Sequence, residues 1–162
     1  MKETSVRPTD DIEAIIQKYG DMLYRICVLM LKSESDAEDA VQETVISYFQ
    51  KAPRFENIEH EKAWLIRVAT NKCRDVLRFR QAHPQMDDEF LSNISCEKTE
   101  SGVLEALAAV PEKYRLVLTL YYVEEYRIEE IAKIIDRTAS AVKMRLQKGR
   151  SLLEKIYREE YL

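Results

Sequence analysis

Two segments of this chain concentrate the positive charge that binding to a polyanion requires. Residues 62–80 include six basic residues and one acidic residue, and residues 137–158 include seven basic residues and one acidic residue. Lys and Arg side chains bind phosphate groups, and Arg also pairs with guanine edges. The two segments therefore make nucleic acid a candidate partner, although the formal net charge is -4. A solvated helix face is the alternative explanation for either segment alone.

A third segment has the opposite charge. Residues 34–43 include five acidic residues and no basic residue. An acidic stretch of this kind repels DNA and favours a separate, non-nucleic-acid partner. The sequence thus divides its charge among segments that can face different molecules.

No group of residues indicates catalysis or metal binding. The three glycines, Gly20, Gly102 and Gly149, stand apart, so both phosphate-binding glycine motifs are missing from the sequence. Three cysteines and two histidines form no C-x-x-C or related zinc pattern. We therefore expect no enzyme activity, no metal and no cofactor. The apolar stretches are too short for a membrane span and the N-terminus has no apolar signal region, so we expect a cytoplasmic protein without membrane insertion.

The elements that would position these charges are predicted to be helices in two groups. Apolar residues recur at helical spacing over about 11–32, from Ser35 to Pro53, and over about 60–80. Ser35 and Glu38 form a capping-box pattern that predicts the second helix start. For the third helix, one candidate core face centres on Trp64 and Val68, and the other on Leu65, Ala69 and Cys73.

The second group of predicted helices ends in a helix-turn-helix pattern. Short helices are expected over about 103–110, 112–123 and 127–135, followed by a turn at 136–138 and a helix of about 20 residues that Thr138 caps. Asp136, in this turn, tolerates a left-handed backbone better than most residues do. A helical hairpin with a solvated basic face is the alternative. The expected fold is all-α, with two small helical domains (11–80 and 101–162), an N-terminal tail (1–10) and a flexible acidic linker (81–100).

Three motifs in order resemble a known family. Glu129-Glu-Ile-Ala-Lys-Ile-Ile with Ala141-Val-Lys-Met-Arg-Leu-Gln-Lys-Gly-Arg resembles region 4 of bacterial sigma factors. Asp36-Ala-Glu-Asp-Ala-Val-Gln-Glu-Thr resembles region 2.2, and Ala63-Trp-Leu-Ile-Arg-Val-Ala-Thr-Asn-Lys-Cys-Arg-Asp resembles the promoter-melting helix. Over residues 11–157 the chain is similar to the extracytoplasmic-function (ECF) subfamily of the sigma-70-type RNA polymerase sigma factors.

The resemblance implies a function, partners and site residues. The chain would bind core polymerase through the β′ clamp helices and the β flap, and would direct promoter recognition and melting in a stress response. Promoter DNA and an anti-sigma factor, which could hold the chain at the membrane, are the other expected partners. The residues implied to bind polymerase are Asp36, Asp39, Gln42 and Glu43. Those implied to bind the minus-ten element are Arg54, Phe55, Asn57, Lys62, Asn71, Lys72, Arg74, Arg78 and Arg80. Those implied to bind the minus-thirty-five element are Arg137, Thr138, Ala139, Ser140, Lys143, Met144, Arg145 and Lys148.

Three further expectations accompany these assignments. The loop 54–61 would hold a base flipped from the non-template strand. Trp64 is expected to pack in the core rather than stack on a base, and Asp75 to pair with Arg74 or Arg78. Two other functions remain alternatives: a helix-turn-helix regulator that acts without polymerase, and a helical adaptor that binds only protein.

Overall fold

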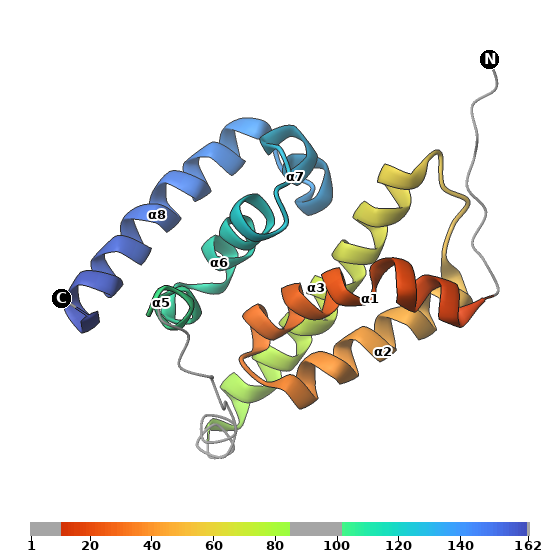
Figure 1. Ribbon diagram of the computed structural model, residues 1–162, viewed down its shortest axis with the longest axis horizontal. Coiled ribbons are helices and arrows are strands. Elements are labelled where there is room, and N and C mark those ends of the chain that lie inside the picture. Colours follow the sequence, from red (N-terminus) through yellow and green to blue (C-terminus); the bar gives the residue numbers. More distant parts are fainter. Residues whose placement is uncertain (1–10, 85–101, 162) are drawn as a thin grey trace. The chain divides into compact units, whose positions relative to one another are not determined.

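The computed structural model describes residues 11–84 and 102–161, which are mostly helical (Figure 1). The chain divides into two compact units, residues 1–87 and 88–162, each with its own core. The expected all-α class with two small helical domains is confirmed. The expected N-terminal tail and most of the expected linker lie outside the described residues.

The first unit is a bundle of three helices, α1 (Ile12–Leu31), α2 (Glu34–Lys51) and α3 (Ile58–Ala82) (Figure 1). Each helix packs against the other two. The helices form because apolar residues recur every three or four positions, which gives each one a stripe to bury. The largest buried side chains of this core are Tyr19, Leu23, Ile26, Met30, Leu31, Tyr48, Phe55, Leu65 and Ile66.

Each helix of the first unit begins at a polar side chain that accepts a hydrogen bond from the backbone. Ser33 Oγ accepts from the Asp36 N–H at 3.2 Å, and Asn57 Oδ1 accepts from the His60 N–H at 2.8 Å. The prediction that Ser35 caps the second helix was therefore wrong by two residues. The third helix likewise starts two residues earlier than expected, because Asn57 satisfies its first backbone donors.

The buried face of α3 follows the second of the two candidate patterns. Leu65, Ala69 and Cys73 are fully buried. Ile66, which belonged to neither pattern, is also buried, and so is the charged Glu61. A helix that packs against two other helices buries a wider stripe of its surface than a helix that packs against one. This wider stripe includes Ile66 and Glu61.

The second unit comprises α5 (Val103–Ala109), α6 (Glu112–Leu118), a π-helical turn (Thr119–Val123), α7 (Ile128–Ile135) and α8 (Ala139–Tyr161). The long helix α8 packs against α5, α6 and α7. At Gly149 of α8, an added Cβ would lie 3.1 Å from Leu118 Cδ1 of α6. Glycine at this position lets α8 and α6 come close together.

The turn between α7 and α8 adopts the geometry that the sequence predicts. Asp136 has a φ of 56°, in the left-handed region, and ends α7. Thr138 Oγ1 accepts a hydrogen bond from the Ala141 N–H at 3.1 Å, so Thr138 caps α8 as expected. These two residues set the direction in which α8 leaves the turn.

Replacing Asp136 tests the turn through two substitutions of opposite sign. Asp136→Gly should stabilise the second unit by about 1 kcal/mol, because glycine adopts left-handed backbone without strain and removes a negative charge from a helix C-terminus. Asp136→Ala should destabilise it by about 1 kcal/mol, since alanine bears the full left-handed penalty. The measurement is thermal unfolding by circular dichroism. Equal effects of both substitutions would contradict this account of the turn.

Candidate functional site

The outward face of α2 carries the expected acidic and amide side chains. Asp39, Gln42 and Glu43 are exposed, whereas Ala37, Ala40 and Thr44 on the opposite side are buried. Ile46 lies one turn beyond Gln42 and is 54% exposed, although it is large and apolar. The sequence offered a sign of this exposed residue, because Ile46 is a large apolar residue that falls outside the predicted buried stripe of this helix. The face thus combines negative charge with one apolar contact point.

Two residues predicted to contact partners are instead paired with each other. Arg80 Nη2 lies 2.6 Å from Asp36 Oδ2, and the two side chains are only 13% and 19% exposed. Arg80 Nη1 also donates to the Leu31 carbonyl at 2.6 Å. The pair ties the end of α3 to the start of α2. Assigning Asp36 to polymerase and Arg80 to DNA conflicts with this geometry, because both charged groups are engaged inside the unit.

The other polar residues predicted along α3 face outward to different degrees. Asn71 and Arg78 are exposed, and the remaining three are half-buried, namely Lys62, Lys72 and Arg74. Arg78 forms an ion pair with Asp75 at 3.1 Å, and Arg78 was one of the two partners expected for Asp75. Exposed pairs of this kind contribute little to stability, so a phosphate can replace the carboxylate at small cost. The outer face of α3 can therefore present cations to a polyanion.

The loop before α3 is shorter and more tightly anchored than expected. Residues 52–57 form it, and Arg54 is exposed there, but Phe55 is fully buried. The Phe55 ring packs on Tyr48 at 6.1 Å, on His60 at 5.3 Å and on Trp64 at 5.8 Å between centroids. A contact between Phe55 and DNA would require this ring to leave its packing on Tyr48, His60 and Trp64.

Two further residues of this region have structural contacts. Asn57 caps α3 through its side-chain oxygen, which accepts from the His60 N–H. Trp64 is half-buried and packs edge-on against Tyr48 and Phe55, so it lies at the margin of the core. Arg54 is therefore the exposed, cationic member of the predicted loop set.

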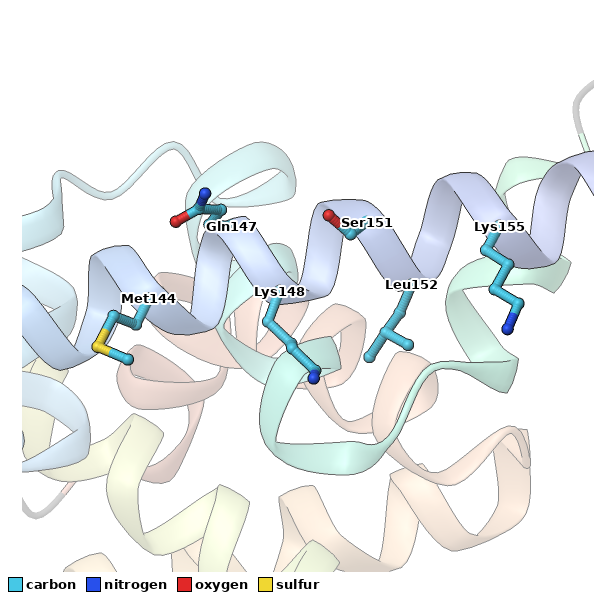
Figure 2. A pocket seen from close by; sticks show the side chains of 6 residues that line it. All are labelled: Met144, Gln147, Lys148, Ser151, Leu152 and Lys155. Carbon is cyan, nitrogen blue, oxygen red and sulfur yellow. The ribbon is translucent and has the colours of Figure 1, made fainter.

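The outward face of α8 is a continuous strip of polar and flexible side chains. Met144, Gln147, Lys148, Ser151, Leu152 and Lys155 line a shallow hollow along this helix (Figure 2). Met144 is 70% exposed. Val142, Leu146 and Gly149 lie on the opposite side and are buried. The packing of α8 therefore determines which of its residues are available to a ligand.

The residues predicted for this helix are distributed unevenly around it. Ser140 and Lys148 are exposed on the same side of α8 as Met144, since residues four positions apart lie about 40° from each other around a helix. Lys143 and Arg145 lie about 100° from Met144 in opposite directions, and Lys143 is exposed whereas Arg145 is half-buried. Gln147, which the sequence did not single out, is also exposed on α8, one residue before Lys148 (Figure 2). An amide at this place can read an adenine edge.

The start of α8 presents the remaining predicted residues. Arg137 and Thr138 are exposed and Ala139 is half-buried. The Thr138 hydroxyl is engaged as an acceptor in the cap. Arg137 Nη1 donates to the neighbouring Asp136 carbonyl at 3.2 Å. The turn thus holds a guanidinium next to the first residues of the exposed strip.

Over residues 11–84 and 102–161, no helix has the length and apolar character that a membrane span requires. Across the same ranges, no three His, Cys, Asp or Glu side chains are grouped so that they could hold a metal ion.

Family comparisons match both units. The sigma-70 region 2 family matches residues 15–83, and the sigma-70 region 4 family matches residues 102–153. The first match covers the three-helix unit, and the second covers α5, α6, α7 and the first two-thirds of α8. The two matches occur in the order that the sequence motifs predict.

Individual proteins are similar over most of the chain. The ECF RNA polymerase sigma factor SigW of Bacillus subtilis is 28% identical, over 98% of this chain and 95% of the relative. The RNA polymerase sigma factor SigV of the same species is 29% identical, over 80% of this chain and 81% of the relative.

Solved structures share the fold at 21% identity. The sigma factor RpoE in complex with the anti-sigma factor NepR, from Bartonella quintana, matches with a TM-score of 0.74 over 94% of this chain and 99% of that chain. CnrH in complex with the cytosolic domain of CnrY matches with a TM-score of 0.66, over 92% and 88%.

The Asp36–Arg80 pair predicts a contrast between two neighbouring arginines. Arg80→Met should lower the free energy of unfolding of the first unit by about 1–3 kcal/mol, since it leaves a mostly buried carboxylate without its charged partner. Arg78→Met, which removes an exposed pair, should change it by less than about 0.5 kcal/mol. Urea unfolding followed by fluorescence measures this, because the one tryptophan, Trp64, lies in the first unit. Equal effects of the two substitutions would show that Arg80 is not an internal tie.

Proposed function

Because the chain belongs to the ECF subfamily of the sigma-70-type RNA polymerase sigma factors, we propose that it binds core RNA polymerase, recognises promoter DNA and helps to melt it. Polymerase would carry out the RNA synthesis. The observation that carries the proposal is the separation of three exposed faces. An acidic face lies on α2, a basic face lies on α3 of the same unit, and a second basic face lies on α8 of the other unit.

The face of α2 is the proposed contact with the β′ clamp helices. Asp39, Gln42 and Glu43 supply charge and hydrogen bonds, and Ile46 supplies apolar surface that water would otherwise cover. An apolar centre with a polar surround is typical of protein interfaces. Asp36 contributes indirectly, because its pair with Arg80 holds the start of α2 in place.

The faces of α3 and α8 are the proposed DNA contacts. On α3, Asn71, Arg78 and the half-buried cations Lys62, Lys72 and Arg74 would lie along the minus-ten element, next to Arg54 of the loop. On α8, the exposed strip around Met144 would enter the major groove of the minus-thirty-five element, which is wide enough for one helix. Lys and Arg contacts to phosphate would position each unit, and Asn71 and Gln147 would read bases.

The two alternative functions leave exposed faces unexplained. A regulator that acts without polymerase gives the acidic face of α2 no partner. A protein-only adaptor gives the basic faces of α3 and α8 no partner. Since two solved structures with this fold contain anti-sigma factors, we also propose an anti-sigma factor as a regulator of this chain, in the cytoplasm where polymerase and DNA are found.

Reversing one charge on α2 should weaken polymerase binding. Asp39→Arg should raise the Kd for core polymerase by about tenfold or more, because like charges at an interface oppose association. Glu13→Arg, at an exposed position of α1, is the matched control and should have little effect. Fluorescence anisotropy of labelled protein measures both. If the two variants bind equally well, α2 is not the clamp contact.

The two DNA contacts should be separable by mutation. Gln147→Ala should relax base selectivity at the minus-thirty-five element by about 1–3 kcal/mol and leave selectivity at the minus-ten element unchanged. Asn71→Ala should do the reverse. Lys148→Ala should weaken binding evenly across sequences and lower its salt dependence, as a phosphate contact does.

Holoenzyme binding to promoters altered in one element at a time measures these effects. The orientation of the two units on DNA would be reversed if Gln147→Ala relaxed selectivity at the downstream element. A uniform loss of affinity in all three variants would mean that bases are read elsewhere.

A further inference from the structure

A buried carboxylate joins the three helices of the first unit. Glu61 lies in the first turns of α3 and is 3% exposed. Tyr19 of α1 donates its hydroxyl to Glu61 Oε1 at 2.5 Å, and Tyr48 of α2 donates to Glu61 Oε2 at 2.7 Å. Lys18 Nζ lies 3.9 Å from Oε1 and is half exposed. One side chain thus bonds to both neighbouring helices.

Carboxylates are rarely buried unless hydrogen bonds offset the loss of water. Burial and the bond to Glu61 raise the pKa of Tyr19 far above its usual value, so its hydroxyl remains a donor. Both carboxylate oxygens are therefore satisfied by short hydrogen bonds with charged character. In other proteins, replacing buried charged groups by apolar side chains of similar volume is often neutral or stabilising, so Glu61 is a candidate for a role beyond stability.

The contacts of Tyr48 connect this carboxylate to the loop 52–57. The Tyr48 ring stacks on Phe55 at 6.1 Å with an interplanar angle of 22°, and meets Trp64 edge-on at 6.1 Å. Phe55 is the buried anchor of the loop. The hydroxyl of Tyr48 is held by Glu61, so the orientation of the ring beneath Phe55 depends on that bond. Tyr19 of α1 bonds to the same carboxylate. The Phe55 ring packs on Tyr48, His60 and Trp64, and Tyr19 is not among these ring contacts, so Tyr19 serves as the comparison for Tyr48.

We propose that Glu61 is a positioning residue for promoter melting, which acts through Tyr48 and Phe55 to hold the loop 52–57 in the conformation that receives an unpaired base of the non-template strand. This inference rests on the proposed function of the loop. In this proposal, the buried contacts of Glu61, Tyr48 and Phe55 determine the shape of the loop, and the exposed residues of the loop contact the DNA.

Two substitutions that each remove a single hydroxyl separate this role from general stability. Tyr48→Phe and Tyr19→Phe each take one hydrogen bond from Glu61 and leave a ring in place. Tyr48→Phe should lower holoenzyme affinity for DNA with a pre-melted minus-ten element by about fivefold to tenfold, as expected for loss of a bond to a charged group. Tyr19→Phe should change it by less than about twofold.

A second DNA probe provides the control readout. A duplex that carries only the minus-thirty-five element should bind both variants as tightly as the unmodified protein, and so should core polymerase. Equal losses on the pre-melted probe for the two variants, or a loss by Tyr48→Phe on the duplex probe, would overturn the positioning role. So would unchanged binding of Tyr48→Phe to the pre-melted probe.

Variants of Glu61 itself provide a rescue test. Glu61→Gln keeps the shape and can still hydrogen-bond to both hydroxyls, so its affinity for pre-melted DNA should stay within about threefold. Glu61→Met has similar length but no hydrogen bonds and should lose at least as much affinity as Tyr48→Phe. Retained affinity in Glu61→Met would overturn the proposal. If Glu61→Met fails to fold, the comparison of the two tyrosine variants decides.

The unmodified holoenzyme distinguishes this inference from the proposed function. It should prefer a pre-melted probe with an intact non-template minus-ten sequence over one with that sequence scrambled. Absence of the preference would refute the function proposed for the loop. A preference that Tyr48→Phe leaves intact would refute only the role of Glu61.

Discussion

The close packing of α8 against α6 at Gly149 determines what the second unit can offer to a ligand. With Val142, Leu146 and Gly149 turned inward, the residues about half a turn away must face solvent, because an α-helix has 3.6 residues per turn. The strip from Ser140 to Lys155 is the result. The same constraint operates in α2, where burial of Ala37, Ala40 and Thr44 turns Asp39, Gln42 and Glu43 outward.

In the first unit, polar groups inside the bundle complement the apolar packing. The Asp36–Arg80 pair closes the bundle where α3 ends, and Glu61 with two tyrosines joins the helices where α3 begins. Each of these buried polar groups would cost free energy if a change in the packing removed one of its hydrogen-bond partners. Each group therefore favours one arrangement of the helices. The exposed face of α3 between them is thereby held in one orientation for its partner.

Helix periodicity allowed the fold class, the helix-turn-helix and the cap at Thr138 to be predicted from the sequence. Asp136 lies in the predicted turn and adopts the left-handed backbone that aspartate tolerates better than most residues. The internal contacts of Phe55, Asp36 and Arg80 could not be predicted, because they join different elements of the fold: Phe55 of the loop meets Tyr48 of α2, and Arg80 meets Asp36 across 44 positions. A charged or aromatic residue in a loop or at a helix end gives no local sign of such a partner, which is also why Glu61 was overlooked.

The central claim is that the exposed faces of α2, α3 and α8 act together on polymerase and promoter DNA. The most direct measurement is run-off transcription with purified core polymerase, this chain and a library of promoters varied at two elements. The account predicts transcripts that depend on the chain and are enriched for both an upstream and a downstream sequence at one constant spacing. Transcription without any selected sequence, or selection of a single element, would contradict it.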